Sequence, residues 1–220
     1  MKGKTMNKRL ARLSVFAALL VAAVASVYAG GWTIITLNDF PDHAVAGKPF
    51  TLTFSIRQHG NNLLAGLKPA VRASTAGGLE VDAAAHPTAN QGEYSATLRL
   101  VGPGEWTIRV DSRFNPEDKV RAYNSLVLPS LKVIRNDAPL PAYSSAERGS
   151  RLFVAKGCIG CHATGSEKDL SQKQFAADYL KKFLADPSIR KVDMPNLQLK
   201  QEEISALTAF INSSSKRKGI

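Results

Sequence analysis

The sequence predicts two domains, an N-terminal all-β sandwich and a C-terminal all-α domain. Before residue 135, several stretches alternate apolar and polar residues with a period of two, the pattern of strands with one buried face. From residue 144 onward the apolar residues recur at helical spacing. A proline-containing stretch separates the two patterns. We therefore predict a β domain over 30–134, a linker over 135–143 and a helical domain over 144–220.

The strand pattern is clearest in PFTLTFSIRQ, which places Leu52, Phe54 and Ile56 on one face and hydroxyl side chains on the other. EYSATLRLV and EWTIRV alternate in the same way. Between them, Gly102-Pro103-Gly104 predicts a tight hairpin. Four further stretches bring the count to about seven strands, which is typical of an immunoglobulin-like sandwich.

Three helices are predicted in the C-terminal region. Ser144 and Glu147 form a capping box ahead of RGSRLFVAKG, and Ser171 and Gln174 form another ahead of FAADYLKKFLAD. Asp186-Pro187 ends the second helix, because the residue before proline disfavours the helical conformation. The third helix is expected over 201–212.

The first 29 residues have the order of a secretory signal peptide. Basic residues without an acidic one come first, an apolar run follows, and Val27-Tyr28-Ala29 offers a cleavage site. The alternative is an uncleaved membrane anchor, for which the apolar run is somewhat short. We therefore expect an exported protein located in the periplasm of a Gram-negative bacterium.

Basic side chains are concentrated in the C-terminal part of the expected mature chain. Residues 143–220 carry 13 basic and 8 acidic side chains, whereas residues 30–142 carry 11 and 10. Export makes nucleic acid an unsuitable partner, so the basic excess points to acidic proteins or to an anionic membrane.

The only two cysteines, Cys158 and Cys161, lie in the segment GCIGCH, with His162 directly after the second. A disulfide here would close a very short loop, with little entropic benefit. A thioredoxin-like redox pair is expected after a strand, in a βαβ unit, but this segment follows a predicted helix. A zinc site needs four ligands, and the other histidines all lie in the predicted β domain.

Cys-x-x-Cys-His is also the signature of covalent haem attachment, the interpretation that we favour. The two thiols would become thioethers on one edge of the porphyrin, and His162 would be the proximal ligand. Removal of the signal peptide leaves Met194 as the only methionine, and it is the predicted distal ligand. A histidine of the β domain is the alternative. We thus expect one covalently bound haem c, with His162 and Met194 as the iron ligands.

The C-terminal stretches RGSRLFVAKGCIGCH, FAADYLKKFLADPSIR and MPNLQLKQEEISALTAFI resemble the small class I c-type cytochromes over about residues 143–213. The resemblance implies the all-α cytochrome c fold, with axial ligands His162 and Met194. It also implies that the first and last helices cross, with Gly149 at the contact. The family often has a proline after the motif, but residues 163–170 contain none, so the group that orients His162 is not identified.

The predicted β domain resembles, more loosely, the YtkA-like and CopC-like exported modules, some of which bind copper. DHAVAGKPFTLTFSIRQHG, GEYSATLRL and GPGEWTIRV carry this likeness. The domain has no methionine, and its histidines His43, His59 and His86 are scattered. We therefore expect them to be solvated loop residues.

Iron with both axial positions filled is suited to passing electrons. We therefore expect single-electron transfer between respiratory redox partners, with no catalytic residues. Basic side chains near the motif would steer acidic docking surfaces, unless they are only the solvated faces of helices; they are Lys156, Lys168, Lys173, Lys181, Lys182, Arg190 and Lys191.

Two other functions are compatible with the sequence. The first is a haem-bearing subunit of a larger periplasmic oxidoreductase complex, docked through the β-sandwich. The second is a copper- or redox-sensing module, in which the sandwich binds the ligand. In each case membrane contact would come only through a partner complex or an uncleaved anchor.

Overall fold

The computed structural model describes residues 32–114, 124–171 and 173–216. The predicted signal peptide, its alternative as a membrane anchor, and Met1 and Met6 lie outside these residues. Within the described ranges, no helix combines the length and the apolar character needed to cross a membrane.

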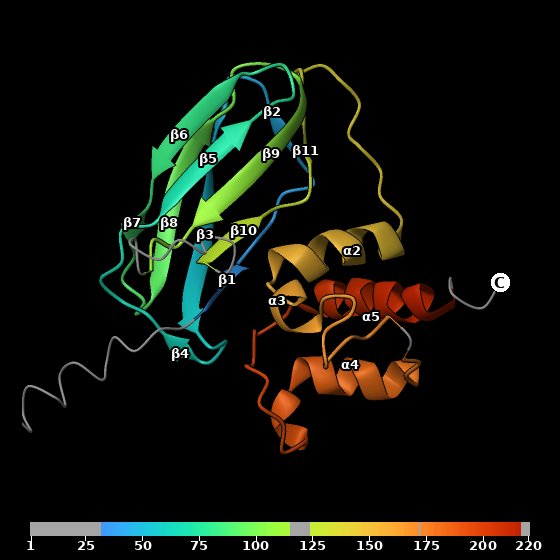
Figure 1. Cartoon of the computed structure of the whole chain (residues 1–220). Coiled ribbons are helices and arrows are strands. Elements are labelled where there is room, and N and C mark those ends of the chain that lie inside the picture. The colour runs from blue at the N-terminus through green and yellow to red at the C-terminus, as the bar shows by residue number, and fades with distance from the viewer. Residues whose placement is uncertain (1–31, 115–123, 172, 217–220) are drawn as a thin grey trace, which may run out of the picture. The chain divides into compact units, whose positions relative to one another are not determined.

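In the described residues the strands form a five-stranded and a six-stranded sheet (Figure 1). The first sheet contains β1 (Thr33–Leu37), β3 (Pro49–Gln58), β4 (Asn62–Leu63), β7 (His86–Pro87) and β8 (Glu93–Arg99). The second contains β2 (His43–Val45), β5 (Ala70–Ser74), β6 (Glu80–Ala84), β9 (Gly104–Asp111), β10 (Ser125–Val127) and β11 (Leu131–Ile134). β2 pairs with β11 in parallel, and the other described pairs are antiparallel.

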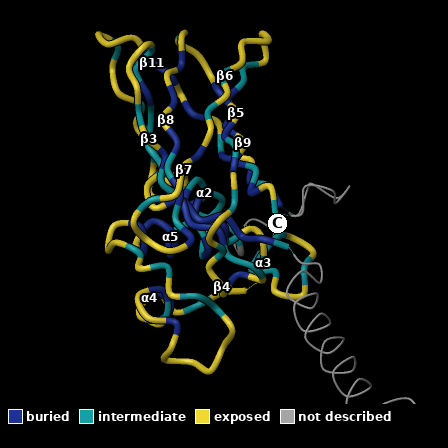
Figure 2. Tube along the Cα trace, turned by 90° about the vertical axis from the view of Figure 1, so that its left-hand side faces the viewer, coloured by how far each residue is buried: buried dark blue, intermediate teal, exposed yellow. Residues whose placement is uncertain are grey.

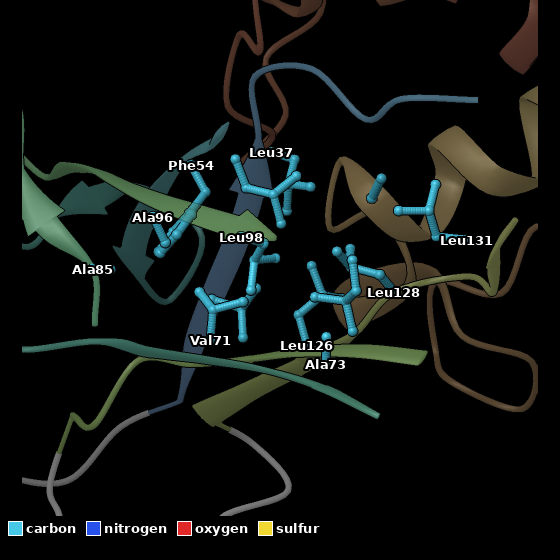
Figure 3. Packing of buried hydrophobic residues seen from close by; sticks show 14 of the residues in the cluster. Leu37, Phe54, Val71, Ala73, Ala85, Ala96, Leu98, Leu126, Leu128 and Leu131 are labelled. Atoms are coloured by element: carbon cyan, nitrogen blue, oxygen red, sulfur yellow. The ribbon is translucent and has the colours of Figure 1, made fainter. Parts of the chain in front are cut away.

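The apolar face predicted for each of the clearest strands is buried in the core between the sheets (Figure 3). Leu52, Phe54 and Ile56 of β3 have no exposed surface, and the alternating apolar residues of β8 and β9 join the same cluster. Period-two alternation predicted the buried face correctly because each of these strands turns one face to the core and the other to solvent.

The predicted hairpin at Gly102-Pro103-Gly104 is wrong. β8 pairs with β3 and β7, whereas β9 pairs with β5, β10 and β11, so the chain crosses here from one sheet to the other. Trp106, which is fully buried, donates a hydrogen bond from Nε1 to the Gly102 carbonyl at 2.9 Å. Two alternating runs joined by a short turn predict the strands correctly but do not determine which sheet each one joins.

β1 differs from the other strands because both of its faces are buried. All five of its residues are buried; Ile35 and Leu37 belong to the sandwich core, whereas Ile34 and Thr36 point out of it. This outer face of β1 meets the segment that contains the two cysteines, as shown below.

The C-terminal region contains four α-helices and one short 3-10 helix among the described residues (Figure 1). They are α2 (Ser145–Ala155), α3 (Ile159–His162), α4 (Ala177–Ala185), the 3-10 helix Pro187–Ile189 and α5 (Gln201–Lys216). α3 was not predicted, and α5 continues beyond its predicted end.

Of the two predicted capping boxes, one is present. Glu147 N–H donates to Ser144 Oγ at 3.3 Å, and Glu147 Oε2 accepts from Ser144 N–H at 2.8 Å. The second prediction is wrong, because α4 begins at Ala177 without a side-chain cap. The segment before α4 is held instead by Asn212 of α5, which exchanges hydrogen bonds with the Phe175 backbone.

α2 and α5 pack against each other at a contact that leaves no room for a side chain. A Cβ atom on Gly149 would lie 2.0 Å from the Ala206 carbonyl oxygen of α5. One turn further along α2, Phe153 contacts Phe210 with ring centroids 5.4 Å apart. Figure 2 shows buried residues gathered in both helices.

α2 is also joined to the sandwich. Ala155, at its C-terminal end, is fully buried in the sandwich core. Arg148 makes an ion pair with Asp42 at 2.7 Å, and Arg151 donates to the Ser130 carbonyl at 2.7 Å. From Trp32 onward the chain forms one compact unit.

These observations correct the predicted fold class. Two sheets dominate, with 31% of the structure in strands and 24% in helices, and no independent all-α domain with the cytochrome c fold is evident. The physical reason is that the helical region packs directly on the sheets: α2 places Ala155 in the sandwich core, while the other helical residues around Leu207 bury a cluster of their own. Residues 135–144 contain no helix or strand, and the predicted limits of the domains and of the linker stay a prediction.

We predict that Gly149→Ala costs about 3 kcal/mol or more of unfolding free energy, because its Cβ would overlap the α5 backbone. Urea unfolding followed by circular dichroism measures this. Gly77→Ala is the matched control, because its Cβ would have only the Thr75 hydroxyl oxygen nearby, at 3.8 Å. Equal stability of the two variants would contradict the close contact between α2 and α5.

Candidate functional site: an apolar cavity around Cys158, Cys161 and His162

The segment with the two cysteines lies directly on the outer face of β1. Gly157 has a φ of +75°, a conformation that glycine adopts without strain. A Cβ there would lie 2.6 Å from the Ile35 carbonyl oxygen, and one on Gly160 would lie 2.6 Å from Ile34 Cδ1. Glycine on either side of Cys158 therefore lets this segment approach the strand closely.

Beside this segment is a cavity of about 440 Å³. It brings together the four site residues predicted from the sequence: Cys158, Cys161 and His162 of the motif, and Met194 of the loop before α5. The rest of the lining is mostly apolar and comes from α2, α4, α5 and β1; it includes Phe153, Phe175, Phe183, Leu184, Leu207 and Ile34. Cavities of this size and character are typical of cofactor sites.

His162 is oriented by a backbone group that the sequence did not identify. Its Nδ1 lies 2.7 Å from the Lys168 carbonyl oxygen. Because a carbonyl oxygen only accepts hydrogen bonds, Nδ1 is the protonated nitrogen, and the lone pair of the neutral ring is on Nε2. This arrangement prepares Nε2 to act as a ligand. A backbone acceptor six residues away leaves no side-chain signal in the sequence.

Both cysteines are free thiols. Burial raises the pKa of the Cys158 thiol to about 12, and it also raises the pKa of the Cys161 thiol. A redox-active Cys-x-x-Cys pair requires the opposite, a thiolate stabilised by a lowered pKa. The surroundings of these thiols are therefore unlike those of a thioredoxin-type site.

Met194 is half-buried and packs against the helical core while it lines the cavity. Its loop contacts the sandwich, because Asn61, in the turn between β3 and β4, donates a hydrogen bond from Nδ2 to Asp193 Oδ1. The residue next to the predicted distal ligand is thus held by the β part of the molecule.

Lys156, two residues before Cys158, is buried and paired. Its Nζ lies 2.8 Å from Glu203 Oε1 of α5 and donates to the Asn38 carbonyl, just after β1, at 2.6 Å. Glu203 also accepts from the Lys200 N–H at 3.0 Å, at the start of α5. This one ammonium group therefore joins the sandwich, the end of α2 and the first turn of α5. The side chain of Lys156 is only 4% exposed. Lys156 is therefore not one of the basic side chains near the motif that could steer acidic docking surfaces.

The contribution of β1 to the cavity was missed in the sequence. Ile34 and Thr36, together with Gly60, form part of the wall. A signal for it exists: WTIITL does not alternate cleanly, and a strand buried on both faces reads as a continuous apolar run.

Among the described residues, no group of three or more His, Cys, Asp or Glu side chains could hold a metal ion, either at this cavity or elsewhere. This corrects the expectation of a metal-binding protein, so far as side chains alone are concerned. His43 lies in β2 and His86 in β7 rather than in loops, and His86 borders a different cavity, on β5, β6 and β9. His59 precedes Gly60, which lines the cavity of the motif. A protein-only zinc site at the motif is therefore unsupported.

No protein-family profile and no curated protein match this chain. Among solved structures, the Lin-41 filamin domain is similar at 12% identity and a TM-score of 0.36, over 49% of this chain and 100% of that one. A superoxide reductase from Ignicoccus hospitalis matches at 16% identity and a TM-score of 0.31, over 47% and 82%. The CARDB domain of a Pyrococcus furiosus protein matches at 12% and 0.29, over 46% and 87%. TM-scores this low assign no function.

The predicted membership of the class I c-type cytochromes is corrected by the fold. Strands rather than helices dominate the described residues, and helices make up only 24% of the structure. The looser likeness to copper-binding modules has no support either, because no histidine cluster forms on the described parts of the sheets.

We predict that Lys156→Met costs about 3–5 kcal/mol of unfolding free energy, because it leaves the Glu203 carboxylate buried without its cation. Adding Glu203→Gln should recover much of this loss, since the amide oxygen can still accept from Lys200. Lys200→Met is the control, because its ion pair with Asp39 is exposed and should contribute less than about 1 kcal/mol. Urea unfolding of the three variants checks the ranking, and an equal cost for Lys156→Met and Lys200→Met would contradict it.

Proposed function

We propose that this protein binds one haem c covalently through Cys158 and Cys161 and transfers single electrons between redox partners. The observation that carries the proposal is the convergence of Cys158, Cys161, His162 and Met194 on one apolar cavity. The motif and Met194 are separated by more than thirty residues, including α4. Nothing in the local sequence requires them to meet.

The residues present fit a haem. The cavity lining is rich in aromatic and aliphatic side chains, which suit the faces of a porphyrin. Two thiols lie on the wall at the spacing of the attachment motif. Because a porphyrin supplies most of the ligands of its iron, the protein needs only one or two of its own, so the lack of a larger side-chain metal group in the described ranges does not count against it.

Each site residue would have a distinct role. Cys158 and Cys161 would form the thioether bonds, and His162 would offer Nε2 as the proximal ligand while Lys168 fixes its orientation. Met194 would offer its thioether sulfur as the distal ligand. When bound, haem supplies an iron that gains or loses one electron.

A carrier role follows from what the chain offers to the iron. With His162 and Met194 both on the cavity wall, both axial positions can be filled by the protein. A thioether ligand raises the reduction potential of the iron. An apolar lining controls the access of solvent to the iron and the local dielectric constant, and both also affect the potential. Because burial raises the pKa of both thiols, they are unlike the thiols of a thioredoxin-like redox pair, the alternative function of a Cys-x-x-Cys segment.

We further propose an exported, periplasmic location, as residues 1–29 indicate, and partners with acidic docking surfaces. Lys168 and Arg190 are exposed and line the cavity. They could attract such partners once the cavity is filled.

Covalent haem attachment is tested by producing the full chain together with a c-type haem maturation system. We expect a mass increase of one haem that survives denaturation. His162→Ala should abolish the haem absorption spectrum seen in the wild-type protein. Replacing both cysteines by alanine should abolish covalent attachment of the haem. His86→Ala is the matched control, because His86 is exposed and borders another cavity. Wild-type protein without covalent haem would refute the proposal.

The distal ligand is tested with Met194→Leu, which keeps the volume of the side chain but removes the ligand sulfur. We expect the weak charge-transfer band of methionine-ligated ferric haem to disappear, carbon monoxide to bind the reduced variant, and the reduction potential to fall. A variant with an unchanged spectrum and potential would show that Met194 is not a ligand.

A further inference from the structure

A buried hydroxyl on the outer face of β1 has no partner in the described structure. Thr36 is 5% exposed, and its Oγ1 has no hydrogen-bond partner among the described residues. Thr36 lines the same cavity as the two cysteines, His162 and Met194. Buried polar groups in folded proteins are almost always hydrogen-bonded, so this hydroxyl needs an explanation.

Neither of the polar neighbours of Thr36 serves as its acceptor in the described structure. Ser55, which faces Thr36 across the β1–β3 pair, accepts a hydrogen bond from Arg57 Nη1 at 2.5 Å. Lys156, the other buried polar side chain on the described cavity wall, is held by Glu203 and by the Asn38 carbonyl. An acceptor for Thr36 is therefore best supplied from inside the cavity.

We infer that Thr36 Oγ1 donates a hydrogen bond to a haem carboxylate, which makes β1 part of the cofactor site. This inference rests on the proposed function. The propionate carboxylates are the acceptors that haem carries on its periphery, and the nitrogens of the porphyrin are bound to iron. The Lys156 ammonium on the same wall binds Glu203 and the Asn38 carbonyl, and its third N–H can donate to the same carboxylate.

The inference gives the sandwich a function at the site. The outer face of β1 supplies Ile34 as apolar wall and Thr36 as hydrogen-bond donor. A donor on this strand would orient the cofactor, since its backbone is held by pairing with β3 along all five residues of β1. The β part would then do more than dock the protein to partners.

The test uses the full chain carrying covalent haem and compares Thr36→Val with Thr36→Ser and Thr208→Val. Valine keeps the shape of threonine but removes the hydroxyl. Thr208 is the matched control, because it is also 5% exposed with an unpartnered Oγ1 in the described structure, but it does not line the cavity. Urea unfolding and the midpoint reduction potential of each variant are measured.

We expect Thr36→Val to lower the stability of the haem-loaded protein and to shift the potential to more negative values, because the carboxylate charge is then less well compensated. Thr36→Ser should restore the wild-type potential. Thr208→Val should leave the potential unchanged and should not lower stability. Reduced haem loading in Thr36→Val alone would support the same conclusion.

The inference is overturned if Thr36→Val has the wild-type potential and the same stability as Thr208→Val. Covalent haem would still be present in that case, and the proposed function would stand. Wild-type protein that takes up no haem would instead refute the proposed function itself, so the two failures are distinguishable.

Discussion

The close packing of the motif on the outer face of β1 is the constraint on which the rest of the site depends. At Gly157 the backbone comes so close to the Ile35 carbonyl oxygen that no Cβ fits, and a Cβ on Gly160 would displace the end of the Ile34 side chain. Because β1 also contributes Ile35 and Leu37 to the sandwich core, the strand links the core directly to the cavity. The position of Cys158 is thereby tied to the sandwich core.

Buried polar contacts also fix the position of the helical region on the sandwich, because apolar packing alone is not directional. The Lys156 ammonium reaches from the end of α2 to Glu203 and to the Asn38 carbonyl. A buried charge is tolerated only when it is paired, and its directional bonds favour one arrangement of the three segments over others. Asn61 and Asp193 form a second link, at the loop that carries Met194. Both links join the helical region to the sandwich.

The chemistry proposed for the cavity follows from its composition. Apolar side chains dominate the wall, and the polar groups that remain have defined roles: two thiols, an oriented imidazole, a thioether, a buried ammonium and the hydroxyl of Thr36. For the electron transfer that we propose, such a wall would hold the iron ligands in place before an electron arrives and so reduce the reorganisation that the transfer requires.

The sequence by itself determined the local features. Alternation identified the strands around Phe54 and Trp106, and the capping box at Ser144 identified the start of α2. The motif spacing and the single methionine of the expected mature chain predicted Cys158, Cys161, His162 and Met194 as site residues, and all four line one cavity. Alternation also misled at Gly102–Gly104, where two adjacent strands join different sheets, and the second capping box did not form.

Only the tertiary structure decided what surrounds those residues. The Lys168 carbonyl that orients His162 is a backbone group, the burial of Lys156 depends on Glu203, and the wall formed by Ile34 and Thr36 comes from a strand more than a hundred residues away. Local periodicity records whether a residue is buried, but it contains no information about which distant surface buries it. For that reason the sequence indicated the ligands, whereas the cavity and its sandwich wall emerged only from the packing.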